Sequence, residues 1–125
     1  MERKEVNPWE WSKQFGFSQA IHLSGADQVL LCSGQTAIGE DGSPPKTSDM
    51  GEQVGIALEN LATVLNAAGM DISNIVKLTV YTTDVDAFIA AAGEPLPNLP
   101  AMTLIGVARL AYPELKVEIE AIAAK

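Results

Sequence analysis

At 125 residues the chain fits one domain, residues 1–125, with a single hydrophobic core, and it is too short for two such domains. The net charge of −8 and the scattered basic residues exclude a nucleic-acid binder with a basic stripe and disfavour binding to an anionic membrane. The lone cysteine, Cys32, excludes a disulfide framework, and no apolar run approaches the roughly 18 residues of a membrane span. We therefore expect a soluble cytoplasmic protein whose partners are small molecules or other proteins.

The N-terminal segment is expected to be irregular over residues 1–16, because it is polar and an Asn-Pro step breaks any early helix. Trp9 and Trp11 either pack this segment onto the edge of the domain or place one indole against a ligand. Two strands are predicted next, from Phe17 to Leu23 and from Gln28 to Ser33, joined by a hairpin-type turn.

A long amphipathic helix is the clearest predicted element, after an irregular loop over residues 36–47. Asp49 and Glu52 have the spacing of a capping box, and Gly69 is suited to the C-terminal cap. Between these ends, apolar residues recur at helical spacing: Met50, Val54, Ala57, Leu58, Leu61, Val64, Leu65 and Ala68. The pattern predicts one helix that covers one face of a sheet.

The second half of the chain predicts three more strands and a short helix. The strands run from Ile75 to Thr82, Thr103 to Leu110 and Lys116 to Ala123, and the helix runs from Asp84 to Ala92 with Phe88 as its anchor. This order indicates an α+β fold, a mixed sheet with two helices on one face. Because the strand from Thr103 is apolar on both sides, we expect neighbouring subunits to cover the other face and to close a symmetric ring.

The candidate chemistry reduces to a Ser-Gly turn and a carboxylate. The sequence has no GxGxxG, P-loop or HExxH motif, and His22 is the only histidine, so no metal, cofactor or Ser-His-Asp triad is predicted. Glu118 and Glu120 share one face of the last strand. Together with Ser33-Gly34, a glutamate suits water activation or proton transfer on a small polar ligand, with a backbone N–H holding an oxyanion. A structural ion pair with Arg109 is the alternative explanation for either glutamate.

Several segments together resemble the Rid (YjgF/RidA) family. They are Ser33-Gly34-Gln35, Gln53 with Ala57 to Leu61, Leu65 to Gly69, Ile75 to Tyr81, Pro100-Ala101 and Val117 to Ala123, and the likeness runs from Phe17 to the C-terminus. The resemblance implies a chorismate-mutase-like subunit in a homotrimer around a central β-barrel, with ligand sites in the clefts between subunits. It also implies hydrolysis of reactive enamines or imines to a 2-keto acid and ammonia.

The resemblance also assigns site residues. Glu118 matches the glutamate that positions the attacking water, and Ser33-Gly34 match the backbone cradle. Met102 stands where relatives have an arginine that clamps the substrate carboxylate, and Phe17 stands where they have a tyrosine. The predicted ligand contacts are Phe17, Cys32, Met102 and Trp9. Cys32 itself is expected to be a buried thiol, because no basic residue is adjacent to it.

These departures leave three hypotheses. The first is a Rid enzyme whose substrate is not a simple 2-imino acid, because Met102 cannot clamp a carboxylate. The second is a non-catalytic trimeric binding protein or chaperone. The third is the ribonuclease or translation-inhibitor role of some relatives, which the net charge of −8 disfavours.

Overall fold

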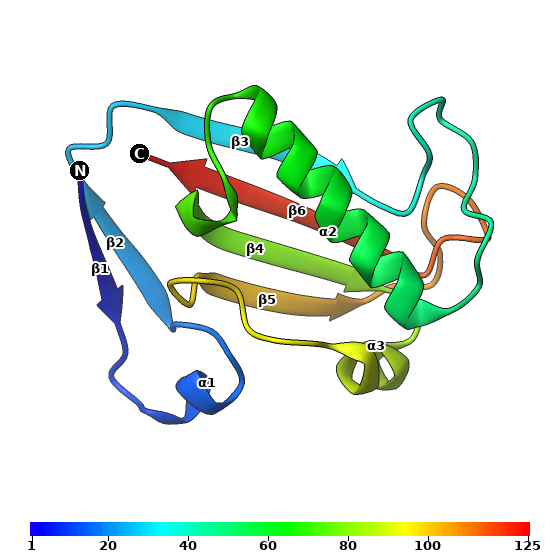
Figure 1. Cartoon of the computed structure of the whole chain (residues 1–125). Coiled ribbons are helices and arrows are strands. Elements are labelled where there is room, and N and C mark those ends of the chain that lie inside the picture. Colours follow the sequence, from blue (N-terminus) through cyan, green and yellow to red (C-terminus); the bar gives the residue numbers. More distant parts are fainter.

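A computed structural model of the chain describes all residues from 1 to 125. It is built on a four-stranded sheet in the order β3-β6-β4-β5, with a separate two-stranded antiparallel sheet, formed by β1 (Glu2–Val6) and β2 (Ala20–Ser24), at one end (Figure 1). The four strands span Val29–Gln35 (β3), Val117–Ala124 (β6), Ile75–Thr82 (β4) and Ala101–Gly106 (β5). β4 and β5 run parallel and the other pairs are antiparallel, so the sheet is mixed, as predicted.

Helix α2, Met50–Ala67, crosses one face of this sheet (Figure 1). Asp49 caps it by accepting a hydrogen bond from the backbone N–H of Glu52, and Gly69 follows the last turn with a φ of 75°, which favours glycine. The short helix α3, Val85–Ala91, is capped by Asp84 and anchored by the buried Phe88. Both predicted helices are confirmed.

The core lies between α2 and the sheet, and the alternation of the last strand explains it. Val117, Ile119 and Ala121 are at most 3% exposed and face α2, whereas Glu118 and Glu120 face the other side. Their partners in the core are Leu61 and Leu65 of the helix together with strand residues of β4. The sequence pattern therefore assigned the two faces of β6 correctly.

The face away from α2, here called the open face, carries large apolar side chains. Leu31 is 75% exposed, Val29 60%, Ile105 39% and Ile122 38%. Polar side chains lie among them, and Lys77 donates to the hydroxyl of Thr103 across 2.6 Å. None of the helices combines the length and the hydropathy that a membrane-spanning helix requires.

The N-terminal third differs from the prediction. Glu2–Val6 forms a strand, β1, within the segment expected to be irregular, and Trp11–Gln14 forms a turn of helix, α1. Strand β2, Ala20–Ser24, pairs with β1 and not with β3. The reason is that the N–H groups of Asp27 and Gln28 both donate to the carbonyl of Lys125, which directs β3 onto β6.

The strand predicted from Thr103 to Leu110 is also corrected, because β5 ends at Gly106. Its neighbour β4 ends at Thr82, which is the register partner of Gly106, so the following residues have no strand to pair with. Arg109 lies in this irregular stretch, where its guanidinium donates to the carbonyls of Leu110 and Ala111.

Candidate functional site

The structure brings Ser33, Gly34 and Glu118 together on the open face, and these three residues are called the polar half-site. A β-bulge between Cys32 and Gln35 inserts one extra residue of β3 opposite β6. Gly34 lies so close to the glutamate that a Cβ atom built on it would be 2.1 Å from Glu118 Oε1. A side chain at position 34 would displace the glutamate from this position, so the Ser-Gly turn and the glutamate form one unit.

The two glutamates of β6 have different surroundings. Tyr81 donates a hydrogen bond of 2.6 Å to Glu120 Oε1, and this bond, with the charges of both glutamates, raises the pKa of the Tyr81 phenol. Glu118 is half-buried and makes no hydrogen bond or ion pair within the chain, although Tyr81 is its direct register partner. The ion pair of Arg109 with either glutamate, weighed above, is not formed.

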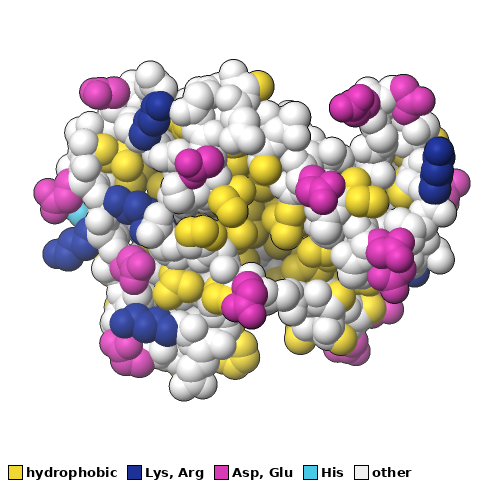
Figure 2. All heavy atoms as spheres, viewed as in Figure 1, with side chains coloured by type: hydrophobic (Ala, Val, Ile, Leu, Met, Phe, Trp, Pro, Cys, Tyr) yellow, Lys and Arg dark blue, Asp and Glu magenta, His cyan; other side chains and the backbone are white.

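An apolar cleft lies on the side of the sheet opposite to the polar half-site, between α1, α3 and β5. Its seven lining residues are all hydrophobic and enclose about 450 Å³: Phe15, Phe17, Phe88, Ile89, Ala92, Met102 and Leu104. This apolar cleft contains no charged or hydrogen-bonding side chain. Figure 2 shows hydrophobic side chains gathered at the centre of this view, in the hollow between the part of the surface formed by α1 and that formed by α3.

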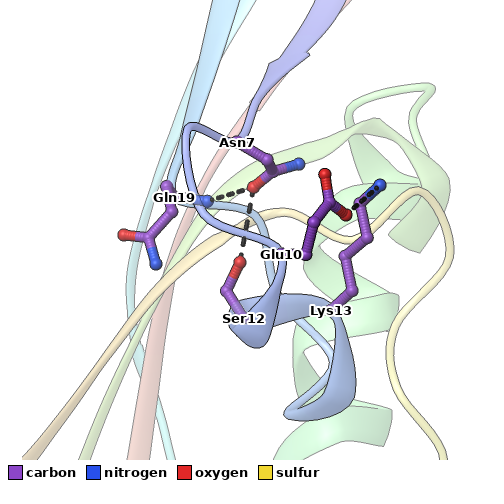
Figure 3. A network of polar contacts seen from close by, with 5 residues as sticks. All are labelled: Asn7, Glu10, Ser12, Lys13 and Gln19. Carbon is purple, nitrogen blue, oxygen red and sulfur yellow. Dashed lines mark hydrogen bonds and ion pairs between the residues drawn. The ribbon is translucent and has the colours of Figure 1, made fainter.

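The aromatic wall of the cleft is held by contacts around α1. Trp11 packs edge-to-face on Phe15 and Phe17, with ring centroids 6.1 and 5.8 Å apart. Asn7 accepts hydrogen bonds from the backbone N–H of Gln19 and the hydroxyl of Ser12, which tie both ends of the segment together (Figure 3). The same view shows an exposed ion pair between Glu10 and Lys13 on the surface of α1.

The floor of the cleft is fixed where β5 begins. Ser18 is fully buried, donates from its hydroxyl to the carbonyl of Leu99 and from its N–H to that of Pro100. Asn98 and Leu99 have φ angles of 64° and 41°, which are unusual for residues with a side chain. The turn before Met102 is therefore held in a strained conformation by the segment that carries Phe17.

One chain does not bring the predicted site residues to a single place. Met102 pairs with Leu78 and Glu118 pairs with Tyr81, three residues apart on β4, so the two side chains leave opposite faces of the sheet. Cys32 lies in the core beneath α2, where burial raises the pKa of its thiol. Trp9 is 60% exposed and lines neither the polar half-site nor the apolar cleft.

The sequence reasoning missed five of the seven lining residues of the cleft. Phe88 was assigned only to anchoring α3, and Phe15, Ile89, Ala92 and Leu104 were not proposed as ligand contacts. The available signals were the Phe15-Gly-Phe17 spacing and the exposed Ile89 next to a buried Phe88 on one short helix. No group of three or more His, Cys, Asp and Glu side chains that could hold a metal ion is present in the structure.

Comparison with known proteins gives consistent matches. Residues 11–125 match the family model described as Endoribonuclease L-PSP. Protein mmf2, mitochondrial, of Schizosaccharomyces pombe is 33% identical over the full length of both chains. The 2-iminobutanoate/2-iminopropanoate deaminase of Salmonella typhimurium is 32% identical over 83% of this chain and 87% of its own. The crystal structure of YyfB from Yersinia pestis, described as a protein of unknown function of the conserved Rid protein family, has a TM-score of 0.83 and 33% identity over all of both chains.

Proposed function

Because the chain belongs to the endoribonuclease L-PSP family, which includes the Rid proteins, we propose that it binds a small molecule between two copies of itself and hydrolyses a reactive enamine or imine that is not a simple 2-imino acid. The observation that carries the proposal is the contact of Gly34 with Glu118. A half-buried carboxylate without an intrachain partner, next to a bulged backbone, is suited to holding and activating a water molecule.

The chemistry follows from these groups. Glu118 accepts a proton from water as the water oxygen bonds to the imine carbon, and the C=N electron pair moves to nitrogen. Glu118 returns this proton to the nitrogen, which gives the neutral carbinolamine. Glu118 then transfers the hydroxyl proton to the nitrogen as the C–N bond breaks and its electron pair goes to nitrogen, so that a carbonyl compound and ammonia are released. The backbone N–H of Gly34 would donate to the oxygen as negative charge develops on it. The backbone of Ser33, the preceding residue, would form the adjoining part of this oxyanion-binding turn.

A complete site requires two copies in this proposal. The polar half-site and the apolar cleft lie on opposite faces of one sheet, so Glu118 of one copy would face Met102 of the next. The exposed Leu31, Val29 and Ile122 on the open face support such an assembly, because exposed apolar patches mark interaction surfaces. A homotrimer predicts a mass in light scattering of three times the 13.2 kDa subunit, and a mass of one subunit would refute it. A cytoplasmic location stays a prediction.

The second candidate is a trimeric binding protein without catalysis. The observation that favours it is Met102, whose thioether lies in a wholly apolar cleft and cannot form charge-assisted hydrogen bonds with a carboxylate. A carboxylate-clamping activity would then be absent while the ligand-binding cleft remained. The same residue distinguishes both candidates from a 2-imino acid deaminase.

The decisive experiment measures carbonyl formation from imines produced in situ. A flavin amine oxidase supplies an imine without a carboxylate, and an L-amino acid oxidase supplies 2-imino acids. We expect the protein to accelerate hydrolysis of the former, and Glu118→Gln to reduce the rate at least about 100-fold. No acceleration at stoichiometric protein, with the Salmonella deaminase as positive control on 2-imino acids, would leave the binding protein as the function.

Met102→Arg is the complementary variant. It should create activity on 2-imino acids if the missing clamp is the only obstacle, because a guanidinium can bind a carboxylate through two hydrogen bonds. Ala90→Arg introduces the same charge on the exposed side of α3 and should create none. If Met102→Arg stays inactive, the hydroxyl that Phe17 lacks is the next difference to restore.

A further inference from the structure

We infer that the apolar cleft binds an aromatic or branched aliphatic group of the ligand, so that the substrate class of the proposed enzyme is an imine or enamine with an apolar body and no carboxylate. The inference rests on the proposed function for the reaction but on the cleft alone for the class of ligand. It assigns specificity to Phe17, Phe88 and Met102.

The size and lining of the cleft carry the first step. About 450 Å³ lies within the range of roughly 300–1,000 Å³ that small-molecule sites occupy. All seven lining side chains are hydrophobic, and three of them are phenylalanines whose rings can pack against a planar or branched group. A flat protein surface would not supply such a volume, so a small molecule is the occupant that fits.

The electrostatics carry the second step. No Lys, Arg or His lines the cleft. A neighbouring pocket, which shares Phe15, Phe88 and Met102 with the cleft, has Glu94 as its only charged lining residue. A carboxylate placed against Met102 would lose its hydration without gaining a cation or a hydrogen-bond donor. A neutral group, or a protonated imine whose charge is directed out of the cleft, meets no such penalty.

The rigidity of the walls carries the third step. A Cβ atom on Gly16 would lie 2.9 Å from Pro95 Cβ, and the φ of Gly16 is 79°, so α1 and the loop before β5 are packed in close contact. Ser18 fixes the strained turn at Leu99 directly ahead of Met102. A cleft with fixed walls is preformed for a ligand and need not collapse when it is empty.

The test is a pair of stable probes of nearly the same shape, the neutral 3-phenylpropanamide and the anionic 3-phenylpropanoate, measured by titration calorimetry on the wild-type protein. We expect the amide to bind at least tenfold more tightly than the carboxylate, and propanamide, which lacks the ring, to bind at least tenfold more weakly than the amide. Met102→Arg should reverse the preference for the amide, whereas Ala90→Arg should leave it unchanged. Ile89→Trp, which fills the cleft from α3, should weaken the amide at least tenfold.

The outcomes separate the inference from the proposed function. Glu118→Gln should abolish imine hydrolysis while the amide still binds at least tenfold more tightly than propanamide, since the ring is held by the apolar cleft and Glu118 acts on the reacting group. If the amide fails to bind but Glu118→Gln abolishes hydrolysis, the apolar-ligand inference is overturned and the hydrolase stands. If the amide and carboxylate bind equally, the cleft is not a site for uncharged ligands and the inference is overturned.

Discussion

Replacing Gly34 by alanine isolates the contact on which the candidate site depends. The new methyl group would lie 2.1 Å from Glu118 Oε1 and 2.6 Å from Glu118 Cδ. Contact between non-bonded heavy atoms is normal near about 3.5 Å, so the carboxylate must move by about 1.4 Å. The φ of Gly34 is not positive, so the backbone itself accepts alanine and the whole effect comes from this overlap.

The expected magnitude differs between stability and activity. Overpacking usually costs about 1–3 kcal/mol, and we expect the lower end because the carboxylate is the far end of a flexible, half-buried side chain. Displacing a catalytic group by about 1 Å can cost about 100-fold in rate. Gly34→Ala should therefore lose activity out of proportion to its loss of stability.

The assay is a double-mutant cycle of Gly34→Ala with Glu118→Ala, measured by urea unfolding. The free energy of unfolding lost by Gly34→Ala should be recovered by about 0.5–1 kcal/mol when Glu118 is already alanine. Gly55→Ala is the matched control, since Gly55 lies exposed in α2 with nothing within 4 Å of a new Cβ, and it should stabilise the chain by about 0.5–1 kcal/mol. An equal loss for Gly34→Ala with and without the Glu118 side chain would refute the reasoning.

Three further predictions concern the scaffold. Gln53→Leu removes a fully buried amide that donates to two loop carbonyls and accepts from one backbone N–H. Urea unfolding should therefore show that the free energy of unfolding falls by at least about 3 kcal/mol, and a decrease of less than about 1 kcal/mol would contradict those hydrogen bonds. The raised pKa of Tyr81 means that its hydrogen bond to Glu120 stabilises the fold below the ordinary phenol pKa near 10, and that this stabilisation is lost as the pH rises through the folded-state pKa. Tyr81→Phe should therefore reduce the loss of stability at alkaline pH and remove the late phenolate step in an absorbance titration. An unchanged titration would reject this role of Tyr81. Asp49→Ala should lower the free energy of unfolding by about 1 kcal/mol because the first turn of α2 loses its cap, whereas no change would show that the cap is dispensable.

The candidate site was only partly predictable from the sequence. Residue type and resemblance predicted that Glu118 and Gly34 belong to one site. Their contact, however, depends on a bulge in β3, which no local sequence pattern predicts. The pairing of Glu120 with Tyr81 in place of Arg109 was not predictable, because it depends on where β5 ends relative to β4. Of the seven residues that line the apolar cleft, only Phe17 and Met102 were predicted, because the cleft forms where α1, α3 and β5, which are distant in sequence, pack together.

The sequence by itself determined the local structure of this protein, that is, where most of its helices and strands form and which of their faces are apolar. The period of apolar residues and the caps at Asp49 and Asp84 defined α2 and α3, and alternation divided β6 into a core face and an open face, because these signals act within a few residues. Only the tertiary structure decided which strands are neighbours, that polar residues Glu2–Val6 form a strand, and that Met102 and Glu118 leave opposite faces of the sheet. Strand pairing joins residues far apart in the chain, and its register is set by partners and ends that the sequence of any one segment does not contain.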